Sequence, residues 1–361
     1  MANHYSFALL SPTEILARQH YLTFLKFGLP KPQVILVTGT KPLKKIPKRP
    51  TIFIGTHALL NQLPQNLTIP LAAVAIDEQH KFGVEQRQVL VKRNPSPHLF
   101  NLTATPIPRT LALGIFGEVS ISTLSQKPKN RLPVKTWVVP PTRYQNSTSW
   151  IKDQLTSGSK IFVVCPHIHE SEKSKSTHGV EKTYQEYQKK YHMNSPIFMI
   201  HGEMAIEKIG EAMASFKKAK QAILVSTSII EVGIDIPEAD VIIIHSAERF
   251  GLASLHQLRG RVGRGERQSY CLLVPTKDEQ EEEDRLVLLQ THHSGLMLSK
   301  MDLRLRGSGE LFGTRQHGWL PVRLKNFWNK KLFGQAREVA LDLIAQNEKE
   351  APAIAKALLT W

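Results

Sequence analysis

The feature that most constrains the fold of this chain is a repeated alternation of short apolar runs with amphipathic stretches. Such an alternation is typical of a parallel sheet covered by helices on both faces. Helical patterns lie between the runs, as at residues 13–27 and 205–217. The runs that we predict to be strands are residues 7–10, 34–37, 51–54, 71–76, 98–102, 134–139, 161–164, 197–200, 222–225, 241–244 and 270–274. The pattern predicts an α/β protein.

The length of 361 residues favours two α/β domains and a tail. Residues 125–133 (SQKPKNRLP) contain two prolines and three basic residues, which is typical of a linker. We therefore predict domains at 1–126 and 127–290 and a C-terminal region at 291–361. Within them, we expect residues 170–192 to form an exposed insertion with a helix. We also expect the acidic run 278–284 to begin a solvated helix, and residues 334–359 to form a last amphipathic helix.

Composition limits the partners and the cellular compartment. A formal net charge of +16 favours a polyanionic partner, with nucleic acid before a membrane surface. Only two cysteines occur, Cys165 and Cys271, so a disulfide framework is excluded, and we expect buried thiols in neighbouring strands. The sequence has neither an apolar stretch of membrane-span length nor the features of a signal peptide at residues 1–15. These observations predict a cytoplasmic protein without a membrane partner.

Two motifs follow strands of the first predicted domain. Asp77 and Glu78 come at the end of the run 71–76, where a parallel sheet binds its ligands. One carboxylate there can hold Mg²⁺ and the other can orient or deprotonate the water that attacks a γ-phosphate. The second motif, 103–106 (TATP), follows the run 98–102 and places small hydroxyl side chains at another strand end. Either motif alone is also compatible with an ordinary surface turn.

Two further motifs lie in the second predicted domain. Residues 257–265 (QLRGRVGRG) set arginines among glycines, and the planar guanidinium matches phosphate oxygens. Arginine from a second domain stabilises charge in many phosphoryl-transfer motors, whereas a plain nucleic-acid-binding loop is the simpler alternative. Residues 226–237 (STSIIEVGIDIP) place hydroxyl groups at a strand-to-helix turn, with Gly233 and Asp235 shaping the turn into the next strand.

The order of these four motifs resembles that of superfamily-2 helicases and translocases, and among them the bacterial RecG family of ATP-dependent DNA helicases. Segments 11–14 (SPTE), 55–57 (GTH) and 201–202 (HG) resemble further DNA-contact motifs. The similarity to RecG rests on 77–87 (DEQHKFGVEQR), 103–113 (TATPIPRTLAL), 248–265 (ERFGLASLHQLRGRVGRG), 266–273 (ERQSYCLL) and 301–318 (MDLRLRGSGELFGTRQHG).

This resemblance implies an α/β fold of two RecA-like parallel-sheet lobes, the first incomplete, with a small helical translocation-motif region. It implies ATP and Mg²⁺ as cofactors and branched or duplex DNA as partner. The catalytic residues it implies are Asp77 (the Mg²⁺ ligand), Glu78, Gln257, Arg261 and Arg264. The coupling residues are Thr103, Thr105, Gly233 and Asp235. The DNA-binding residues are Thr13, Thr56, His57, His201, Thr227, Arg304, Arg306, Thr314, Arg315 and Gln316.

One departure from the family concerns the phosphate-binding loop GxxxxGK[ST]. The sequence contains no Gly-Lys dipeptide, and Gly158-Ser159-Lys160 precedes a strand instead of following it. We therefore expect the first lobe to lack an interior strand, the chain alone to hydrolyse ATP weakly or not at all, and its gene to be truncated, split or incompletely defined. An upstream polypeptide could then supply the loop.

The resemblance implies a monomeric, nucleoid-associated helicase or translocase that acts on stalled forks and Holliday junctions in recombination and repair. Two alternatives remain: a non-catalytic DNA-binding remnant, and a duplex translocase similar to the transcription-repair coupling factor. The GTRQ segment at 313–316 favours RecG over the latter.

Overall fold

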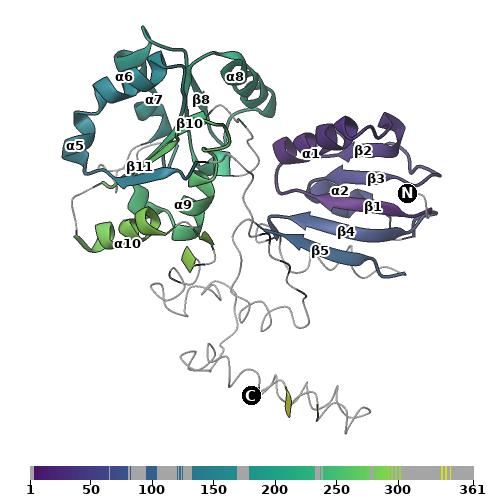
Figure 1. Ribbon diagram of the computed structural model, residues 1–361. Helices are drawn as coiled ribbons and strands as arrows, with labels where there is room; N and C mark the ends of the chain where they lie inside the picture. The colour runs from purple at the N-terminus through teal and green to yellow at the C-terminus, as the bar shows by residue number, and fades with distance from the viewer. Residues whose placement is uncertain are drawn as a thin grey trace. The chain divides into compact units, whose positions relative to one another are not determined.

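The computed structural model describes most of two parallel α/β lobes (Figure 1). The described residues are 4–64, 66–79, 82, 95–103, 120, 122, 124, 132–168, 179–231, 236, 239–276, 280–292, 294, 295, 297, 298, 301, 335, 338, 339 and 342. The chain divides into two compact units, residues 1–105 with 127–295 and residues 106–126 with 296–361. Both sheets lie in the first unit, as a first lobe (described residues 4–103) and a second lobe (described residues 132–295). The domain boundaries predicted above stay a prediction.

The first lobe contains a sheet of order β2-β3-β1-β4-β5, in which all paired strands are parallel. Its described residues also form helix α1, the short helix α2 and one turn of 3-10 helix, η1, ahead of β2. The elements are β1 (Ser6–Leu10), α1 (Glu14–Lys26), η1 (Lys31–Gln33), β2 (Val34–Val37), β3 (Ile52–Gly55), α2 (His57–Gln62), β4 (Leu71–Asp77) and β5 (His98–Leu102).

Successive residues of the first-lobe strands alternate between two apolar clusters, one on each face of the sheet. Leu9, Ile54 and Ala75 pack with Ala17 of α1, whereas Leu10, Phe53 and Ile76 pack with Leu59 and Leu60 of α2. Because both faces are covered, the strands read as nearly continuous apolar runs. Figure 1 shows α1 and α2 beside the strands that they cover.

The second lobe contains a six-stranded parallel sheet of order β6-β11-β10-β7-β9-β8. Its elements are β6 (Lys135–Val138), α5 (Pro141–Gln145), α6 (Thr148–Thr156), β7 (Lys160–Val164), α7 (Val180–Tyr191), β8 (Ile197–Ile200), α8 (Ile206–Lys218), β9 (Ala222–Ser226), η4 (Ser228–Glu231), β10 (Ala239–His245), η5 (Ala247–Arg249), α9 (Leu252–Arg259), β11 (Tyr270–Val274) and α10 (Gln280–Thr291).

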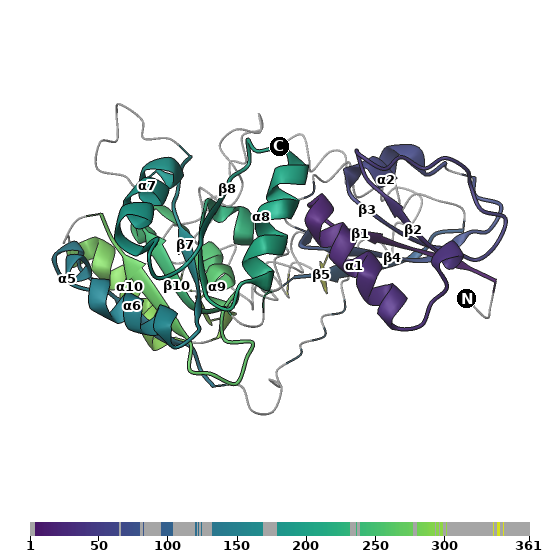
Figure 2. The same ribbon diagram turned by 90° about the horizontal axis from the view of Figure 1, so that it is seen from above.

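One face of the second sheet packs against α6 and α7, through Ile151, Leu155, Tyr187 and Tyr191. Across the sheet, Phe216 of α8 packs against Phe162 of β7, with ring centroids 5.5 Å apart. The helices around the second sheet can be followed from above in Figure 2. Strands β7, β9 and β10 are buried at every position. Among the described helices, none is long and apolar enough to cross a bilayer.

The predicted α/β class and the strand positions are confirmed, to within one or two residues at the ends. Two expectations are wrong. Cys165 and Cys271 are buried, but they do not lie in neighbouring strands, because β10 separates β7 from β11. The helix expected in an exposed insertion, α7, buries four side chains, because Val180, Thr183, Tyr187 and Tyr191 recur with helical spacing on one face.

Two helices were predicted in the last third of the chain, one beginning in the acidic run 278–284 and one at 334–359. Helix α10 begins within the acidic run, but it is not fully solvated, because Leu286 and Leu289 are buried and the helix contacts β6 and α9. In the segment 334–359, the described positions 335, 338, 339 and 342 are helical. The remainder of that prediction lies outside the described residues.

Candidate functional site

Several described site residues of both lobes follow the carboxyl ends of strands, whereas Gln257, Arg261 and Arg264 lie at the end of α9 and beyond it. In the first lobe, Thr56 follows β3, Asp77 ends β4 and Thr103 follows β5. In the second lobe, His201 follows β8 and Thr227 follows β9. Because the strands of each sheet are parallel, the residues that follow strands lie along a single edge of each sheet. This is the edge at which open α/β sheets bind ligands.

Of the two acidic residues, Asp77 is hydrogen-bonded and Glu78 has a strained backbone conformation. The Nε2 atom of His20, on α1, lies 2.9 Å from Oδ2 of Asp77 and donates to that carboxylate. Glu78 is only 8% exposed and has a φ of 49°, in the left-handed region that a residue with a Cβ rarely adopts. Such a conformation costs ~1–3 kcal/mol and concentrates at functional sites. The strain marks Glu78 as a residue whose position the surrounding structure imposes.

The arginine-rich segment begins at the end of α9, and its three arginines lie in different environments. Arg259 is buried and donates to the carbonyl oxygens of Leu289 at 2.6 Å and His292 at 3.0 Å. Burial lowers the pKa of Arg259, and the two carbonyls solvate its charge. Arg259 therefore ties α9 to α10, whereas Arg261 and Arg264 lie beyond the helix end.

Gly263 gives this segment a turn that no other residue fits. Its φ is +78°, and a Cβ there would lie 2.7 Å from Cγ2 of Val134. Both the backbone conformation and the neighbouring side chain therefore require glycine. The turn sets the positions of Arg261 and Arg264 on either side of it.

The acidic pair and the two arginines line one cavity of about 370 Å³. In addition, the amide Nε2 of Gln257 lies 3.4 Å from Oε2 of Glu78. The lining residues are Leu16, Gln19, His20, Leu22, Thr23, Lys26, Asp77, Glu78, Lys217, Arg261 and Arg264. The structure thus brings together four of the five predicted catalytic residues in one lining, and the fifth, Gln257, contacts Glu78.

The donor set of this cavity suits a triphosphate that carries a divalent cation. The volume falls within the ~300–1,000 Å³ of ligand sites. Arg261, Arg264 and Lys217 could neutralise phosphate oxygens, and Asp77 could hold Mg²⁺, which prefers oxygen ligands and retains waters. Within the described part of the chain, no three His, Cys, Asp or Glu side chains gather closely enough to hold a metal ion. Since Mg²⁺ keeps several waters in protein sites, phosphate and water could complete the coordination of a cation at Asp77.

The described residues predicted to contact DNA include two helix caps. The Oγ1 atom of Thr13 accepts from the Leu16 N–H at 3.3 Å, and Oγ1 of Thr56 accepts from the Ala58 N–H at 3.5 Å. Each hydroxyl keeps a proton that can be donated to a phosphate oxygen. His57 stacks on Phe82, with ring centroids 4.5 Å apart. Gly55 lets β3 end close to β2, since a Cβ there would lie 2.2 Å from the carbonyl oxygen of Val37.

Some predicted residues lie outside the described part of the chain, and their roles stay predictions. They are the coupling residues Thr105, Gly233 and Asp235 and the DNA-binding residues Arg304, Arg306, Thr314, Arg315 and Gln316.

Sequence reasoning missed His20 and Lys217, which both line the cavity. Neither belongs to a motif that we singled out. His20 reaches Asp77 because β1 pairs directly with β4, so the helix that follows β1 passes near the end of β4. The sequence signal for His20 is a polar residue in the helix after a site-bearing strand, which is too common to identify it.

Comparisons with known proteins locate two helicase domains in the chain. Residues 1–113 match the family model of the DEAD/DEAH box helicases, and residues 146–266 match that of the helicase conserved C-terminal domain. The ATP-dependent DNA helicase RecG of Synechocystis sp. (strain ATCC 27184 / PCC 6803 / Kazusa) is 40% identical over 353 residues, which are 95% of this chain and 42% of that protein. The chain belongs to the RecG-type helicases of superfamily 2.

A second relative has a similar relation to the chain. RecG of Streptococcus pneumoniae serotype 4 (strain ATCC BAA-334 / TIGR4) is 39% identical over 324 residues, which are 87% of this chain and 47% of that protein. The chain therefore spans about half the length of the curated RecG proteins that it matches.

Solved structures agree with this family. RecG bound to a three-way DNA junction aligns with a TM-score of 0.67 at 30% identity, over 91% of this chain and 43% of that one. Dbp5 of S. cerevisiae, bound to RNA and ADP BeF3, aligns with a TM-score of 0.60 at 15% identity, over 84% of this chain and 82% of that one. The Dbp5 likeness shows the fold alone. The two sheets are the parallel α/β domains of RecA-like helicases, as predicted.

Proposed function

We propose that this chain supplies motor lobes of an ATP-dependent DNA helicase or translocase of RecG type, which acts on branched DNA such as stalled forks and Holliday junctions in recombination and repair. The observation that carries the proposal is the cavity that Asp77, Glu78, Arg261 and Arg264 line together. Phosphoryl transfer needs a cation site, a group that orients water and positive charge near the transferred phosphate, and this lining supplies the side chains for all three.

The residues of the cavity have distinct proposed roles. Asp77 would hold Mg²⁺, which would supply positive charge to neutralise the phosphate oxygens. Glu78 orients or deprotonates the attacking water, and its imposed backbone conformation fixes its direction. Arg261 and Arg264 stabilise charge on the phosphoryl group with planar donors, and Gln257 holds the Glu78 carboxylate.

The DNA partner is proposed on separate grounds. Thr13, Thr56, His57, His201 and Thr227 would contact backbone phosphates, which fix position on DNA without reading its sequence. The net charge of +16 supports a polyanionic partner, and the solved structure of RecG on a three-way junction supports branched DNA. Thr103 would couple hydrolysis to movement. We further propose that the protein acts as a cytoplasmic monomer on the nucleoid.

Nucleotide photo-crosslinking tests the cavity. The purified chain would be irradiated with 8-azido-ATP and Mg²⁺, alone and with a three-way DNA junction. We expect the wild-type chain to crosslink. Asp77→Asn and Arg261→Ala should each reduce crosslinking at least about tenfold, because each removes a charge next to the phosphates. Lys189→Gln, on the exposed side of α7, is the control and should leave crosslinking unchanged.

Two results would overturn this function. Crosslinking that neither cavity variant reduces would place the nucleotide elsewhere. The absence of any crosslinking, together with salt-sensitive junction binding, would favour the non-catalytic DNA-binding alternative.

A further inference from the structure

The first 76 residues have an extreme charge imbalance that the motor motifs do not explain. From residue 15 to residue 76 the sequence has eight Lys and Arg and no Asp or Glu. Five of the eight lie between β2 and β3, at Lys41, Lys44, Lys45, Lys48 and Arg49, and all five are exposed. We name residues 41–49 the basic loop.

The basic loop is restrained at several points. Pro42 and Pro47 lie within it and Pro50 follows it, and proline limits the freedom of an extended chain. The backbone N–H of Leu43 donates to Oε1 of Gln62 at 2.6 Å. At the start of the loop, Thr38 and Lys41 exchange backbone hydrogen bonds of 3.0 and 3.2 Å. The backbone of the basic loop is therefore restrained before any partner binds.

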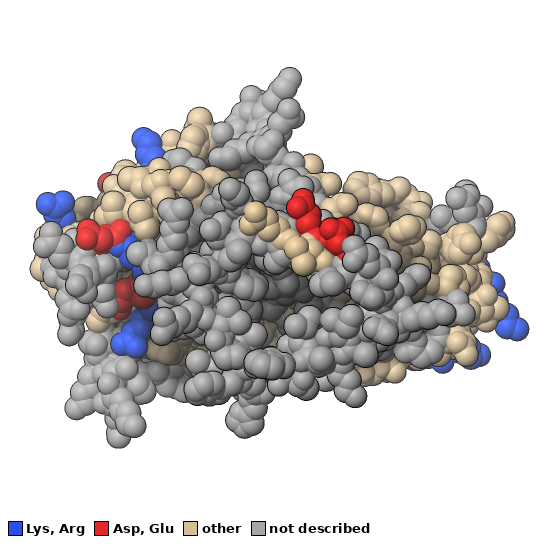
Figure 3. All heavy atoms as spheres, turned by 90° about the horizontal axis from the view of Figure 1, so that it is seen from below, with Lys and Arg blue, Asp and Glu red and all other residues tan. Residues whose placement is uncertain are grey.

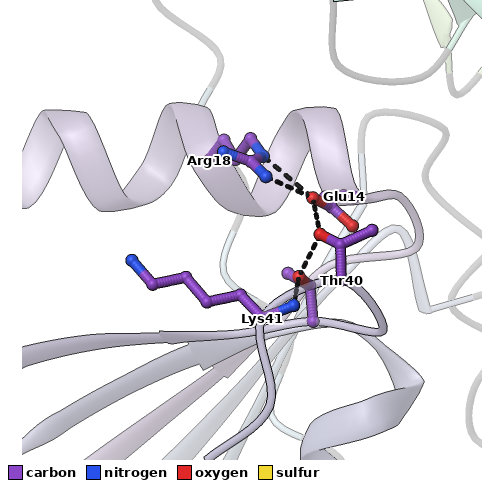
Figure 4. A network of polar contacts seen from close by, with 5 residues as sticks. Glu14, Arg18, Thr40 and Lys41 are labelled. Carbon is purple, nitrogen blue, oxygen red and sulfur yellow. Dashed lines mark hydrogen bonds and ion pairs between the residues drawn. The ribbon is translucent and has the colours of Figure 1, made fainter. Parts of the chain in front are cut away.

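The only carboxylate in residues 1–76, Glu14, is already bound by other groups (Figure 4). Arg18 donates to it through Nε at 2.9 Å and Nη2 at 2.6 Å, and the Thr40 hydroxyl donates at 2.6 Å. Burial raises the pKa of Glu14, but these hydrogen bonds and the Arg18 charge outweigh it, so the pKa is lowered. Glu14 thus anchors the root of the loop, and Arg18 already balances its charge.

The cations beyond this anchor have no acidic counterpart nearby. Lys41 turns away from Glu14 and lies over the ring of Tyr21, 5.6 Å from its centroid. For the part of the chain with described placement, no carboxylate forms an ion pair with Lys44, Lys45, Lys48 or Arg49. On the face drawn in Figure 3, described Lys and Arg side chains (blue) stand at the right-hand edge, apart from the described Asp and Glu side chains (red). Like charges held this close repel one another unless an anion neutralises them.

The root of the basic loop adjoins residues that we propose to contact DNA. Glu14, which accepts from Thr40, directly follows Thr13 in sequence. The backbone N–H of Thr56 donates to the carbonyl of Val37, at the end of β2 from which the loop departs. Phosphate contacts at Thr13 and Thr56 would therefore bring a polyanion to the start of the loop.

We infer that the basic loop binds the phosphate backbone of duplex DNA and extends the DNA surface of the first lobe through Lys44, Lys45, Lys48 and Arg49. This inference rests on the proposed function, because DNA must first reach the carboxyl edge of the first sheet. A DNA backbone fits better than a membrane surface, because the loop contains no helix that could bury an apolar face in lipid. The contacts carry no sequence information and add affinity and orientation.

The experiment measures how the affinity for a fluorescent three-way DNA junction depends on salt, by anisotropy between 50 and 200 mM NaCl. The loop variant is Lys44→Gln, Lys45→Gln, Lys48→Gln and Arg49→Gln combined. The control variant is Lys31→Gln, Lys189→Gln, Lys190→Gln and Lys220→Gln combined, which removes the same charge. These four exposed lysines lie where the chain approaches the amino ends of β2, β8 and β9, and none of them lines the cavity. Circular dichroism checks that both variants fold.

Each phosphate contact contributes about 0.9 to the slope of log affinity against log salt. We expect the loop variant to lose about 2–4 from this slope and about tenfold or more in affinity at 100 mM NaCl, with a change below about 1 in the control. Equal slopes in the two variants would overturn the inference and leave the motor function intact. A wild-type chain that does not bind the junction would overturn both.

A second arm distinguishes lipid from DNA. If vesicles with anionic phosphatidylserine bind the wild-type chain but not the loop variant, while the junction slope is unchanged, the loop is a membrane contact and the inference is wrong.

Discussion

Two interior strands, one in each lobe, are alike in geometry and different in chemistry. Strands β4 and β10 each have seven residues, and each is followed by a non-glycine residue in the left-handed region, Glu78 with φ 49° and Ser246 with φ 50°. The first strand ends in a carboxylate pair and the second in His245 and Ser246. Both strands are therefore followed by a residue in the same left-handed backbone conformation, and the side chains there decide which lobe supplies the acidic groups.

The lobes also differ in how completely their strands are covered. In the second lobe, Leu224 of β9 is fully buried. In the first lobe, Leu99, Phe100 and Leu102 of the edge strand β5 are 40%, 54% and 46% exposed. An exposed apolar edge is open to pairing with another strand. The comparison predicts a second lobe that is well protected and a first lobe whose edge contributes little to stability.

The largest expected effect concerns thiol labelling, which reports on the second lobe because both cysteines lie there. Burial raises the pKa of Cys165 and of Cys271 to about 12. At pH 8 the reactive thiolate fraction is then ~10⁻⁴, against ~0.1 or more for a free thiol. We expect native labelling by a disulfide reagent to be about a thousandfold slower than in urea. Lys45→Cys, in the exposed basic loop, should label promptly, and equally fast native labelling of Cys165 or Cys271 would contradict the buried second lobe.

Truncating leucine in each lobe should give unequal losses of stability. Leu224→Ala removes a fully buried side chain and should cost ~2–5 kcal/mol, because a cavity remains. Leu99→Ala, at a 40% exposed position, should cost less than ~1 kcal/mol. Urea unfolding followed by circular dichroism measures both. A similar cost for Leu99→Ala would show that β5 is covered in solution.

The two lobes should lose stability at opposite ends of the pH range. In the second lobe, the thiols ionise near pH 9 when unfolded but only near pH 12 when folded. The folded state then binds more protons, so the free energy of unfolding falls as pH rises above about 9. In the first lobe, the lowered pKa of Glu14 stabilises at neutral pH and this contribution is lost on acidification. The free energy of unfolding would be measured across pH for two variants. Cys165→Ala/Cys271→Ala should reduce its fall at alkaline pH, and Glu14→Gln should reduce its fall at acid pH.

The smallest effect concerns His20 and the Asp77 carboxylate. Losing a hydrogen-bonding partner of a metal-binding carboxylate weakens cation binding by about tenfold or more. We therefore expect His20→Ala to raise the Mg²⁺ concentration needed for 8-azido-ATP crosslinking by about tenfold. His98→Ala, on exposed β5, is the control, and an equal shift in both variants would exclude a positioning role for His20.

Local patterns were sufficient to predict much of the fold and of the site. Buried parallel strands appear as apolar runs, so β7 and β9 were predicted almost residue by residue. The family motifs marked Asp77, Glu78, Arg261 and Arg264, which the structure brings into one lining. The helix α7 was misjudged because a mostly polar composition concealed four buried side chains spaced along one face.

The sequence by itself determined which segments become strands and that the acidic motif follows the carboxyl end of one of them, because side-chain periodicity and turn residues act locally. Only the tertiary structure decided the order of the strands, since pairing joins residues far apart in the chain. That order inserts β10 between the two cysteine-bearing segments and places β1 beside β4, which brings His20 to Asp77. It also decided that Arg259 binds carbonyl oxygens while Arg261 and Arg264 line the cavity, because burial and acceptor positions depend on packing between elements.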